Sequence, residues 1–142
     1  MIIHIDTSAL VDALTGPRRS LDTLIDLTGQ GHRIGMSTIV LYEWLRGPRT
    51  RAELSAQEEL FPSERAVEFG APAAAIAARL YKQLARPQGR EIDLALAASA
   101  IASGAAIWTL NPADFRDVPN LRLIERTFGT SAGGGNRTHT RG

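Results

Sequence analysis

The 142-residue chain contains no cysteine, and this absence removes several classes of function at once. Disulfide scaffolds, thiolate zinc sites and cysteine nucleophiles are all excluded. Histidine is also scarce, because only His4, His32 and His139 are present, too few and too scattered for a histidine-built metal site. A metal bound by this chain must therefore be held by oxygen atoms, which favours Mg²⁺ or Mn²⁺ over zinc.

The chain also lacks a strong excess of charge of one sign, since its formal net charge is +1. The last fourteen residues, 129–142, contain Arg137 and Arg141 and no acidic residue. Removing these two arginines from the 16 basic residues leaves 14 against 15 acidic residues for the rest of the chain. Binding to nucleic acid must then rely on local patches rather than on a polycationic surface.

Long hydrophobic segments are nearly absent as well. Residues 94–113 carry no charge, but they include serine, glycine, asparagine and proline, so a buried helix followed by a buried strand fits better than a membrane span. The chain begins with Met1 and an apolar run that has no basic region and no cleavage site, which argues against a secretory signal. We therefore expect no membrane association and a cytoplasmic location.

Short apolar runs alternate with helical patterns along the chain. Strands are expected at 2–5, 32–37, 105–109 and 121–124, with an ambiguous one at 65–69, and helices at 8–14, 20–27, 39–45, 49–60, 72–86 and 91–103. This alternation predicts an α/β fold in which helices cover both faces of a central, mostly parallel sheet. Residues 1–128 are expected to form one domain, and the glycine-rich tail 129–142 is expected to be disordered.

Four acidic residues occur at telling places in this pattern. Asp6 directly follows the first strand, and Asp114 follows the strand 105–109 by one short turn. In a parallel sheet both would emerge at the same edge, and helix starts such as that at Asp93 face this edge too. Glu43 is the only carboxylate in the apolar helix 39–45, and its direction is not fixed by its place in the helix.

Each of these residues also has an explanation that involves no function. Asp6 would cap the first helix, Glu43 would pair with Arg46 three residues on, Asp93 would favour a helix N-terminus, and Asp114 would form an Asx-turn. These explanations do not account for four carboxylates arriving near one edge. Carboxylates brought together without a counter-charge repel one another, so such a fold normally holds a cation or a proton there.

Four segments carry a resemblance to a known family. They are 5–8, 37–43, 90–98 and 109–115, with the sequences IDTS, STIVLYE, REIDLALAA and TLNPADF. In this order and spacing they resemble the PIN-domain family, and more closely the VapC toxins of bacterial toxin–antitoxin pairs, over about residues 2–126. The resemblance implies a three-layer α/β/α sandwich, a Mg²⁺ or Mn²⁺ site, endonucleolytic cleavage of single-stranded RNA, homodimers and a cognate antitoxin.

The resemblance also assigns roles to residues of this chain. Asp6, Glu43, Asp93 and Asp114 match the acidic quartet, and we expect Asp6, Asp93 and Asp114 to contact the metal while Glu43 acts through water. Ser8 and Asn111, together with Thr7 and Thr109, match the polar positions that support the ligands. A metal-activated water would attack the phosphodiester and leave a 5′-phosphate and a 3′-hydroxyl. Leu110 departs from the family, in which arginine is frequent at that position.

An RNA substrate, single-stranded or structured, requires a basic surface near the acidic residues. The candidates lie close in sequence to Glu43 and Asp93, and the alternative is that they face solvent or the antitoxin. They are Arg46, Arg49, Arg51, Arg86 and Arg90. Trp44 and Trp108 would stack RNA bases if they were exposed, but both lie in apolar segments and are expected in the core.

Other functions fit the sequence less well. A haloacid-dehalogenase-like phosphatase needs a second aspartate where Ser8 stands, and a receiver domain needs a lysine at the sheet edge, whereas Lys82 lies mid-helix. A nucleotide-binding protein would need a glycine-rich phosphate loop, and the glycine run at 133–135 belongs to the tail. The main alternative is a catalytically silent PIN fold that binds RNA or an antitoxin.

Overall fold

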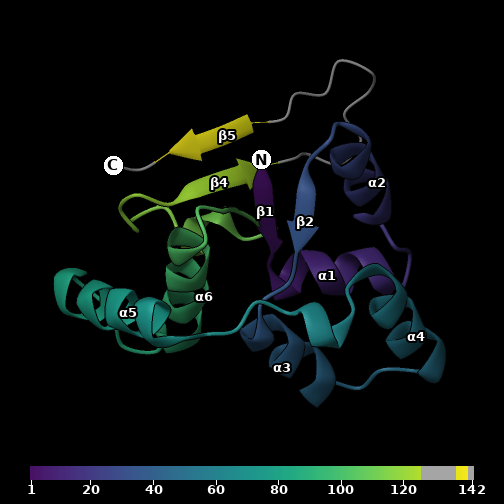
Figure 1. Cartoon of the computed structure of the whole chain (residues 1–142), viewed down its shortest axis with the longest axis horizontal. Coiled ribbons are helices and arrows are strands. Elements are labelled where there is room, and N and C mark those ends of the chain that lie inside the picture. The colour runs from purple at the N-terminus through teal and green to yellow at the C-terminus, as the bar shows by residue number, and fades with distance from the viewer. Residues whose placement is uncertain (126–136, 141–142) are drawn as a thin grey trace.

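The computed structural model describes residues 1–125 and 137–140, and its elements alternate along the chain as the sequence predicts (Figure 1). The first half contains β1 (Ile2–Ile5), α1 (Thr7–Leu14), α2 (Leu21–Gly29), β2 (Arg33–Gly35), α3 (Thr38–Arg46), α4 (Arg51–Leu60) and the short 3-10 helix η1 (Ser63–Arg65). The second half contains α5 (Ala71–Gln83), α6 (Glu91–Ala102), β3 (Ala106–Trp108), the 3-10 helix η2 (Pro112–Asp114), β4 (Arg122–Glu125) and β5 (Arg137–Thr140).

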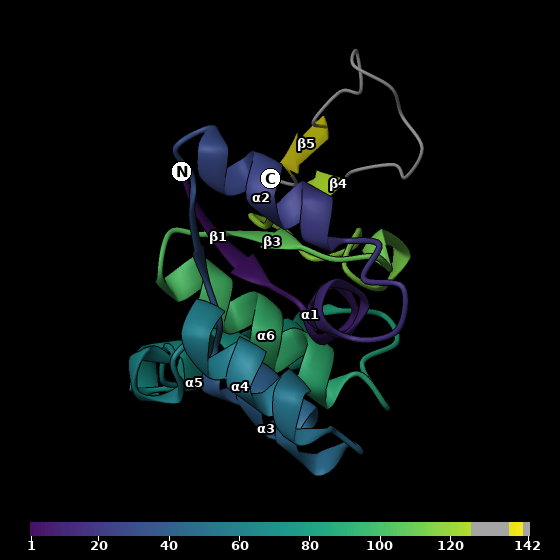
Figure 2. The same ribbon diagram turned by 90° about the vertical axis from the view of Figure 1, so that its right-hand side faces the viewer.

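The strands form one sheet in the order β2-β1-β3-β4-β5. The first four strands are parallel, and Ile3 at the centre of β1 lies opposite Ile34 of β2 and Ala106 of β3. Helix α2 lies on one side of the sheet, while α3, α4, α5 and α6 lie on the other (Figure 2). The predicted α/β/α sandwich with a mostly parallel central sheet is confirmed.

The core explains why the central strands are so apolar. Ile3, Ile5 and Ile107 are at most 2% exposed, because parallel strands are covered on both faces. Helix α6 is apolar on nearly all sides, and most of its residues from Leu94 to Ala100 are buried between α5 and the sheet. The charge-free segment 94–113 is thus a buried helix followed by a buried strand. Among the described residues no helix has the length and apolar character needed to cross a membrane.

Two local expectations were wrong. The ambiguous strand 65–69 is reduced to a single bridge between Val67 and Ser37, because η1 occupies the residues just before it. The helix expected at 72–86 ends at Gln83, with Leu84 in an extended conformation, so Arg86 lies outside it. Arg86 precedes Pro87, and a residue before proline is disfavoured in the helical conformation.

The C-terminal segment also differs from its expected disorder at one place. Arg137–Thr140 pairs antiparallel with β4 as the fifth strand of the sheet. Without it β4 would be an edge strand with unpaired backbone groups, and β-branched threonines favour the strand conformation. The other residues of the expected tail, 129–136 and 141–142, lie outside the described part of the chain.

Candidate functional site

The predicted site residues lie where the two central strands end. The backbone N–H of Asp6 donates to the carbonyl of Trp108 at 2.8 Å, so the pairing of β1 and β3 continues up to Asp6. Asp6 is at once the residue after β1 and the N-cap of α1, and Thr109 directly follows β3. The carboxyl ends of neighbouring parallel strands are where α/β proteins place their sites.

The carboxylate of Asp6 is anchored by three donors. Its Oδ2 accepts from the Thr109 hydroxyl at 2.6 Å and from the Ser8 hydroxyl at 3.1 Å, while its Oδ1 accepts from the Thr7 backbone N–H at 2.7 Å. Asp6 is only 8% exposed, and an ionised carboxylate at such a position needs these donors. The orientation of Asp6 is therefore set by residues from both strand ends.

The same two hydroxyls hold the loop after β3. The Ser8 hydroxyl oxygen accepts from the backbone N–H of Leu110 at 3.0 Å, and the Thr109 hydroxyl oxygen accepts from that of Asn111 at 3.0 Å. The partly buried Ser8 and the buried Thr109 thus both support Asp6. Asn111 contributes through its backbone, and its side chain is exposed, so the expectation that its amide orients a ligand carboxylate has no contact behind it.

Glu43 on α3 is turned toward this network by Thr7. The Thr7 hydroxyl donates to Oε1 of Glu43 at 2.6 Å, while the Thr7 backbone N–H contacts Asp6, so one residue connects the two carboxylates. Oε2 of Glu43 lies 3.6 Å from the guanidinium of Arg46, one helical turn away. Glu43 therefore forms the local ion pair with Arg46 and also points toward Asp6, so the two interpretations do not exclude each other.

Asp93 and Asp114 bring the remaining two carboxylates. Asp93 lies half-buried in the first turn of α6, and Asp114 is exposed at the end of η2. Burial raises the pKa of Asp93 to about 6, with further increases from the negative charges of Asp114, Asp6 and Glu43 and a decrease from Arg90. The negative charges of three other segments thus act on Asp93.

The pKa of Asp6 responds to opposing causes. Burial raises it, the hydrogen bonds from Thr109, Thr7 and Ser8 lower it, and the charge of Glu43 raises it again. The burial cost is the larger effect, so the pKa of Asp6 lies above its usual value of 3.8. Without a cation, the folded chain at neutral pH therefore holds carboxylates under repulsion and partial desolvation.

The donor set fits a hard divalent cation with water among its ligands. Every candidate ligand is a carboxylate or hydroxyl oxygen, the type that Mg²⁺ and Mn²⁺ prefer. Within the described residues, no three Asp, Glu, His or Cys side chains stand close enough to hold an ion by themselves. Mg²⁺ commonly uses one or two carboxylates and keeps several waters, so these residues suit such an ion rather than a cage built from protein alone.

The candidate RNA-contact arginines differ in exposure and in the contacts that they make. Arg49 lies 4.2 Å from the ring centre of Trp44 and donates to its carbonyl at 2.9 Å, and Arg90 pairs with Asp117. The other candidates, Arg46, Arg51 and Arg86, are exposed. Trp44 and Trp108 are at most 1% exposed, which confirms that both tryptophans belong to the core.

A family model described as the PIN domain matches residues 3–121. The chain belongs to the PIN-domain family. The match covers α1 through η2 and includes every acidic residue of the site, so the resemblance inferred from the sequence is confirmed. No curated protein sequence matches this PIN domain at a significant level.

Solved structures similar to this PIN domain come from toxin–antitoxin complexes. VapBC2 from Rickettsia felis, bound to a DNA fragment from its promoter, is 26% identical with a TM-score of 0.68, over 87% of this chain and 97% of that chain. DNA-bound VapBC from Salmonella typhimurium is 21% identical with a TM-score of 0.70, over 87% and 96%. VapBC-5 from Mycobacterium tuberculosis is 20% identical with a TM-score of 0.58, over 86% and 96%.

The raised pKa of Asp93 makes a prediction for stability. A folded pKa of about 6 against an ordinary value of 3.8 means that the folded chain retains a proton that the unfolded chain has lost. Metal-free stability should therefore fall as pH rises from about 4 to about 6. Asp93→Asn cannot titrate, so in EDTA at about pH 7 it should melt at a higher temperature than wild type, and the difference should shrink at about pH 4.5.

Thermal melts of both proteins at the two pH values, in EDTA and in excess Mg²⁺, check this expectation. Mg²⁺ should stabilise wild type by about 2.7 kcal/mol at a concentration near one hundred times its dissociation constant, and should stabilise the variant less. If Asp93→Asn melts below wild type in EDTA and gains as much from Mg²⁺, Asp93 only stabilises the start of α6.

Proposed function

We propose that this PIN domain is a metal-dependent endoribonuclease toxin of the VapC type, which cleaves single-stranded RNA in the cytoplasm and is neutralised by a cognate antitoxin. The observation that carries the proposal is the anchoring of a buried carboxylate, Asp6, by the hydroxyls of Thr109 and Ser8 at the carboxyl edge of the sheet. Asp6 and Glu43 are joined through hydrogen bonds with Thr7. The pKa of Asp93 is raised by burial and then by the charges of Asp114, Asp6 and Glu43. A fold that needed these residues only for capping would gain nothing from this repulsion.

Each residue has a distinct part in the proposed reaction. Oδ2 of Asp6 already accepts hydrogen bonds from two hydroxyls, whereas Oδ1 accepts only one, so Oδ1 has acceptor capacity left for a metal. Asp93 and Asp114 would complete the negative surface that holds the cation. Glu43, fixed by Thr7, would orient a water molecule rather than bind the metal directly. The hydrogen bonds from Thr109 and Ser8 favour the ionised form of Asp6 and fix its orientation, as metal binding requires.

A bound Mg²⁺ or Mn²⁺ would lower the pKa of a water molecule and offset the negative charge that builds on the phosphate. The residues of the chain bind the substrate and hold the proton-accepting groups in place. Hydrolysis of this kind leaves a 5′-phosphate and a 3′-hydroxyl. Among the arginines, Arg46 is the best-placed RNA contact, because it is exposed, stands beside Glu43 and lies 5.4 Å from the ring of the exposed Tyr42.

An antitoxin partner is proposed because the similar solved structures are VapBC complexes. The chemistry of the site supports it, since an unpaired group of carboxylates attracts a guanidinium fork. A partner that inserted an arginine beside Asp93 and Asp114 would cover the site and remove the repulsion between the two carboxylates. The antitoxin would then neutralise the toxin because its arginine would occupy the position of the metal ion.

The runner-up proposal is a PIN fold that binds RNA or an antitoxin without turnover. It keeps the same fold and the same partner, but it does not need ionised carboxylates that repel one another. Asp6, Glu43, Asp93 and Asp114 are all present, and Thr7, Ser8 and Thr109 contact two of them. We therefore favour the enzyme, and an assay of cleavage separates the two proposals.

The purified protein should cleave single-stranded RNA in Mg²⁺ or Mn²⁺ and should stop when EDTA is added. Asp6→Asn, Asp93→Asn and Asp114→Asn each remove a negative charge from the proposed metal site at nearly constant shape, so each should abolish cleavage while the circular dichroism spectrum persists. Asp12→Asn is the matched control. The carboxylate of Asp12 accepts a hydrogen bond from the Ser20 hydroxyl at 2.7 Å and takes no part in the site, so this variant should retain wild-type cleavage. Cleavage that survives EDTA, or an active Asp93→Asn, would refute the metal mechanism.

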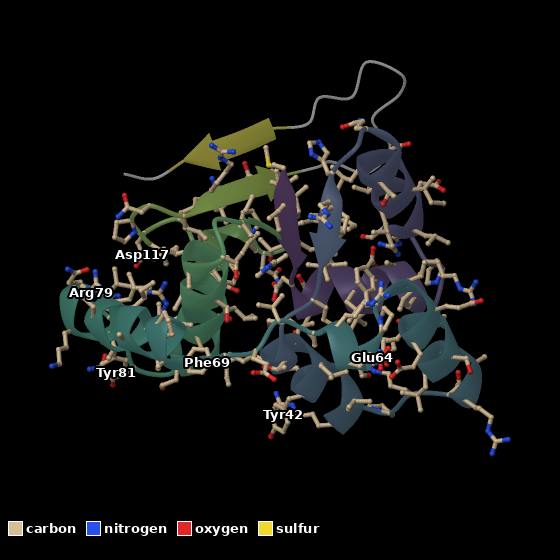
Figure 3. The ribbon with its side chains drawn as sticks, viewed as in Figure 1. Tyr42, Glu64, Phe69, Arg79, Tyr81 and Asp117 are labelled. Carbon is tan, nitrogen blue, oxygen red and sulfur yellow. The ribbon has the colours of Figure 1, made fainter. Side chains whose placement is uncertain are left out.

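We also propose that the chain forms homodimers, since large side chains remain exposed on one part of the surface. Tyr42, Phe69 and Tyr81 are 56%, 37% and 39% exposed, and they lie along the same lower edge of the molecule (Figure 3). Burying such side chains between two copies would remove apolar surface from water.

Sedimentation at micromolar concentration should therefore show a dimer. Tyr81→Arg should shift it toward monomer, because it introduces a charge into the proposed contact. Ile25→Arg is the matched control: Ile25 is 60% exposed, but it lies on α2, across the sheet from α5 (Figure 2). A wild-type protein that sediments only as monomer contradicts the dimer.

A further inference from the structure

Arg90, a candidate for RNA contact, is already engaged within the fold through both of its Nη atoms. Its Nη1 donates to Oδ2 of Asp117 at 2.8 Å, and its Nη2 donates to Oδ1 of Asp117 at 2.7 Å. The same Nη2 also donates to the backbone carbonyl of Asp114 at 3.0 Å. Both ends of the guanidinium fork are therefore occupied, in the two-pronged geometry that is strongest between arginine and a carboxylate.

The position of this contact in the fold is the second observation. Arg90 is the N-cap of α6, three residues before Asp93, and its side chain is 21% exposed. Asp117 lies three residues after Asp114 in the loop between β3 and β4, and its hydrogen bonds with Arg90 connect that loop to the start of α6. The guanidinium thus joins the two segments that carry Asp93 and Asp114.

These two segments need such a connection because their carboxylates repel one another. Asp114 ends the three-residue 3-10 helix η2 and is exposed, while the next residue, Phe115, is buried in the core. The charge of Asp114 acts on Asp93, and the charge of Arg90 opposes it. The Arg90 guanidinium binds the loop through the Asp114 carbonyl and the Asp117 carboxylate, and so keeps Asp114 near Asp93. The carboxylate of Asp114 itself makes no hydrogen bond with Arg90 and stays available to the site.

We propose that Arg90 and Asp117 form a clamp that sets the separation of Asp93 and Asp114 and thereby the affinity of the site for its divalent cation. This inference rests on the proposed function. Arg90 is then a positioning residue, and it does not contact RNA, because a phosphate would first have to displace Asp117. Lysine cannot replace it, since an ammonium group is a point charge without the planar fork that spans Asp117 and the Asp114 carbonyl.

The test measures Mn²⁺ binding by electron paramagnetic resonance of the free ion, in the absence of RNA and at neutral pH. Arg90→Lys and Asp117→Asn should each raise the half-saturating Mn²⁺ concentration by about tenfold or more, as loss of groups that orient metal ligands usually does. Cleavage at saturating Mn²⁺ should recover most of the wild-type rate, since the reacting groups are all present. Arg116→Lys is the matched control, because Arg116 pairs with Glu125 at 2.6 Å from the same loop.

Asp117→Asn also separates the clamp from an RNA-binding role for Arg90. It frees the guanidinium from a carboxylate that is 51% exposed, so the fold should tolerate it. An RNA-contact arginine would then bind a short single-stranded RNA as well as before or more tightly, with Mn²⁺ binding unchanged. The clamp is wrong if either variant binds Mn²⁺ like Arg116→Lys. If wild type binds no Mn²⁺ at all, the metal site fails, and with it both the proposed function and the clamp.

Discussion

The buried carboxylate of Asp6 is the group on which the rest of the site depends. It ends β1, begins α1 and reaches across to Thr109 at the end of β3, so its position is fixed by the pairing of two central strands. Burying a carboxylate is costly unless donors surround it, and here a backbone N–H and two hydroxyls do so. Because the donors of Asp6 come from both strand ends, disturbing the sheet would disturb the site.

From Asp6 the site extends by charge rather than by direct contact. Thr7 brings Glu43 of α3 toward Asp6, and Asp93 of α6 lies close enough for its pKa to reflect all three other carboxylates. Four segments far apart in the sequence thus place like charges near one another. The sheet and the buried core hold these charges together, so a cation that bound only the folded chain would stabilise it.

Much of this arrangement could be predicted from the sequence. Asp6 and Asp114 follow strands and Asp93 begins a helix, so parallel topology alone brings them to one edge. The direction of Glu43 could not be predicted, because it depends on a hydroxyl of Thr7, 36 residues away. The apolar context of Trp44 and Trp108 was enough to predict their burial.

The arginines show where sequence proximity is a poor guide. Arg90 stands three residues from Asp93, which suggests a phosphate contact, yet its partner Asp117 is 27 residues away and nothing local reveals it. Arg49 likewise folds back over Trp44. Among the polar supports, the Thr109 hydroxyl donates directly to Asp6. Asn111 is linked to Asp6 only indirectly, because its backbone N–H donates to that same hydroxyl. Strand β5 was missed because glycine-rich sequence surrounds a short stretch of strand-forming residues.

The central claim is that Asp93 is electrostatically coupled to the other carboxylates, and its ionisation can be measured directly. The ¹³C resonance of the Asp93 carboxyl group, followed by NMR against pH in metal-free protein, should titrate with a midpoint of about 6. In Asp114→Asn the midpoint should move down toward 3.8, because one repelling charge is gone. A midpoint that stays the same in Asp114→Asn would contradict the account, because burial alone would then set the pKa of Asp93.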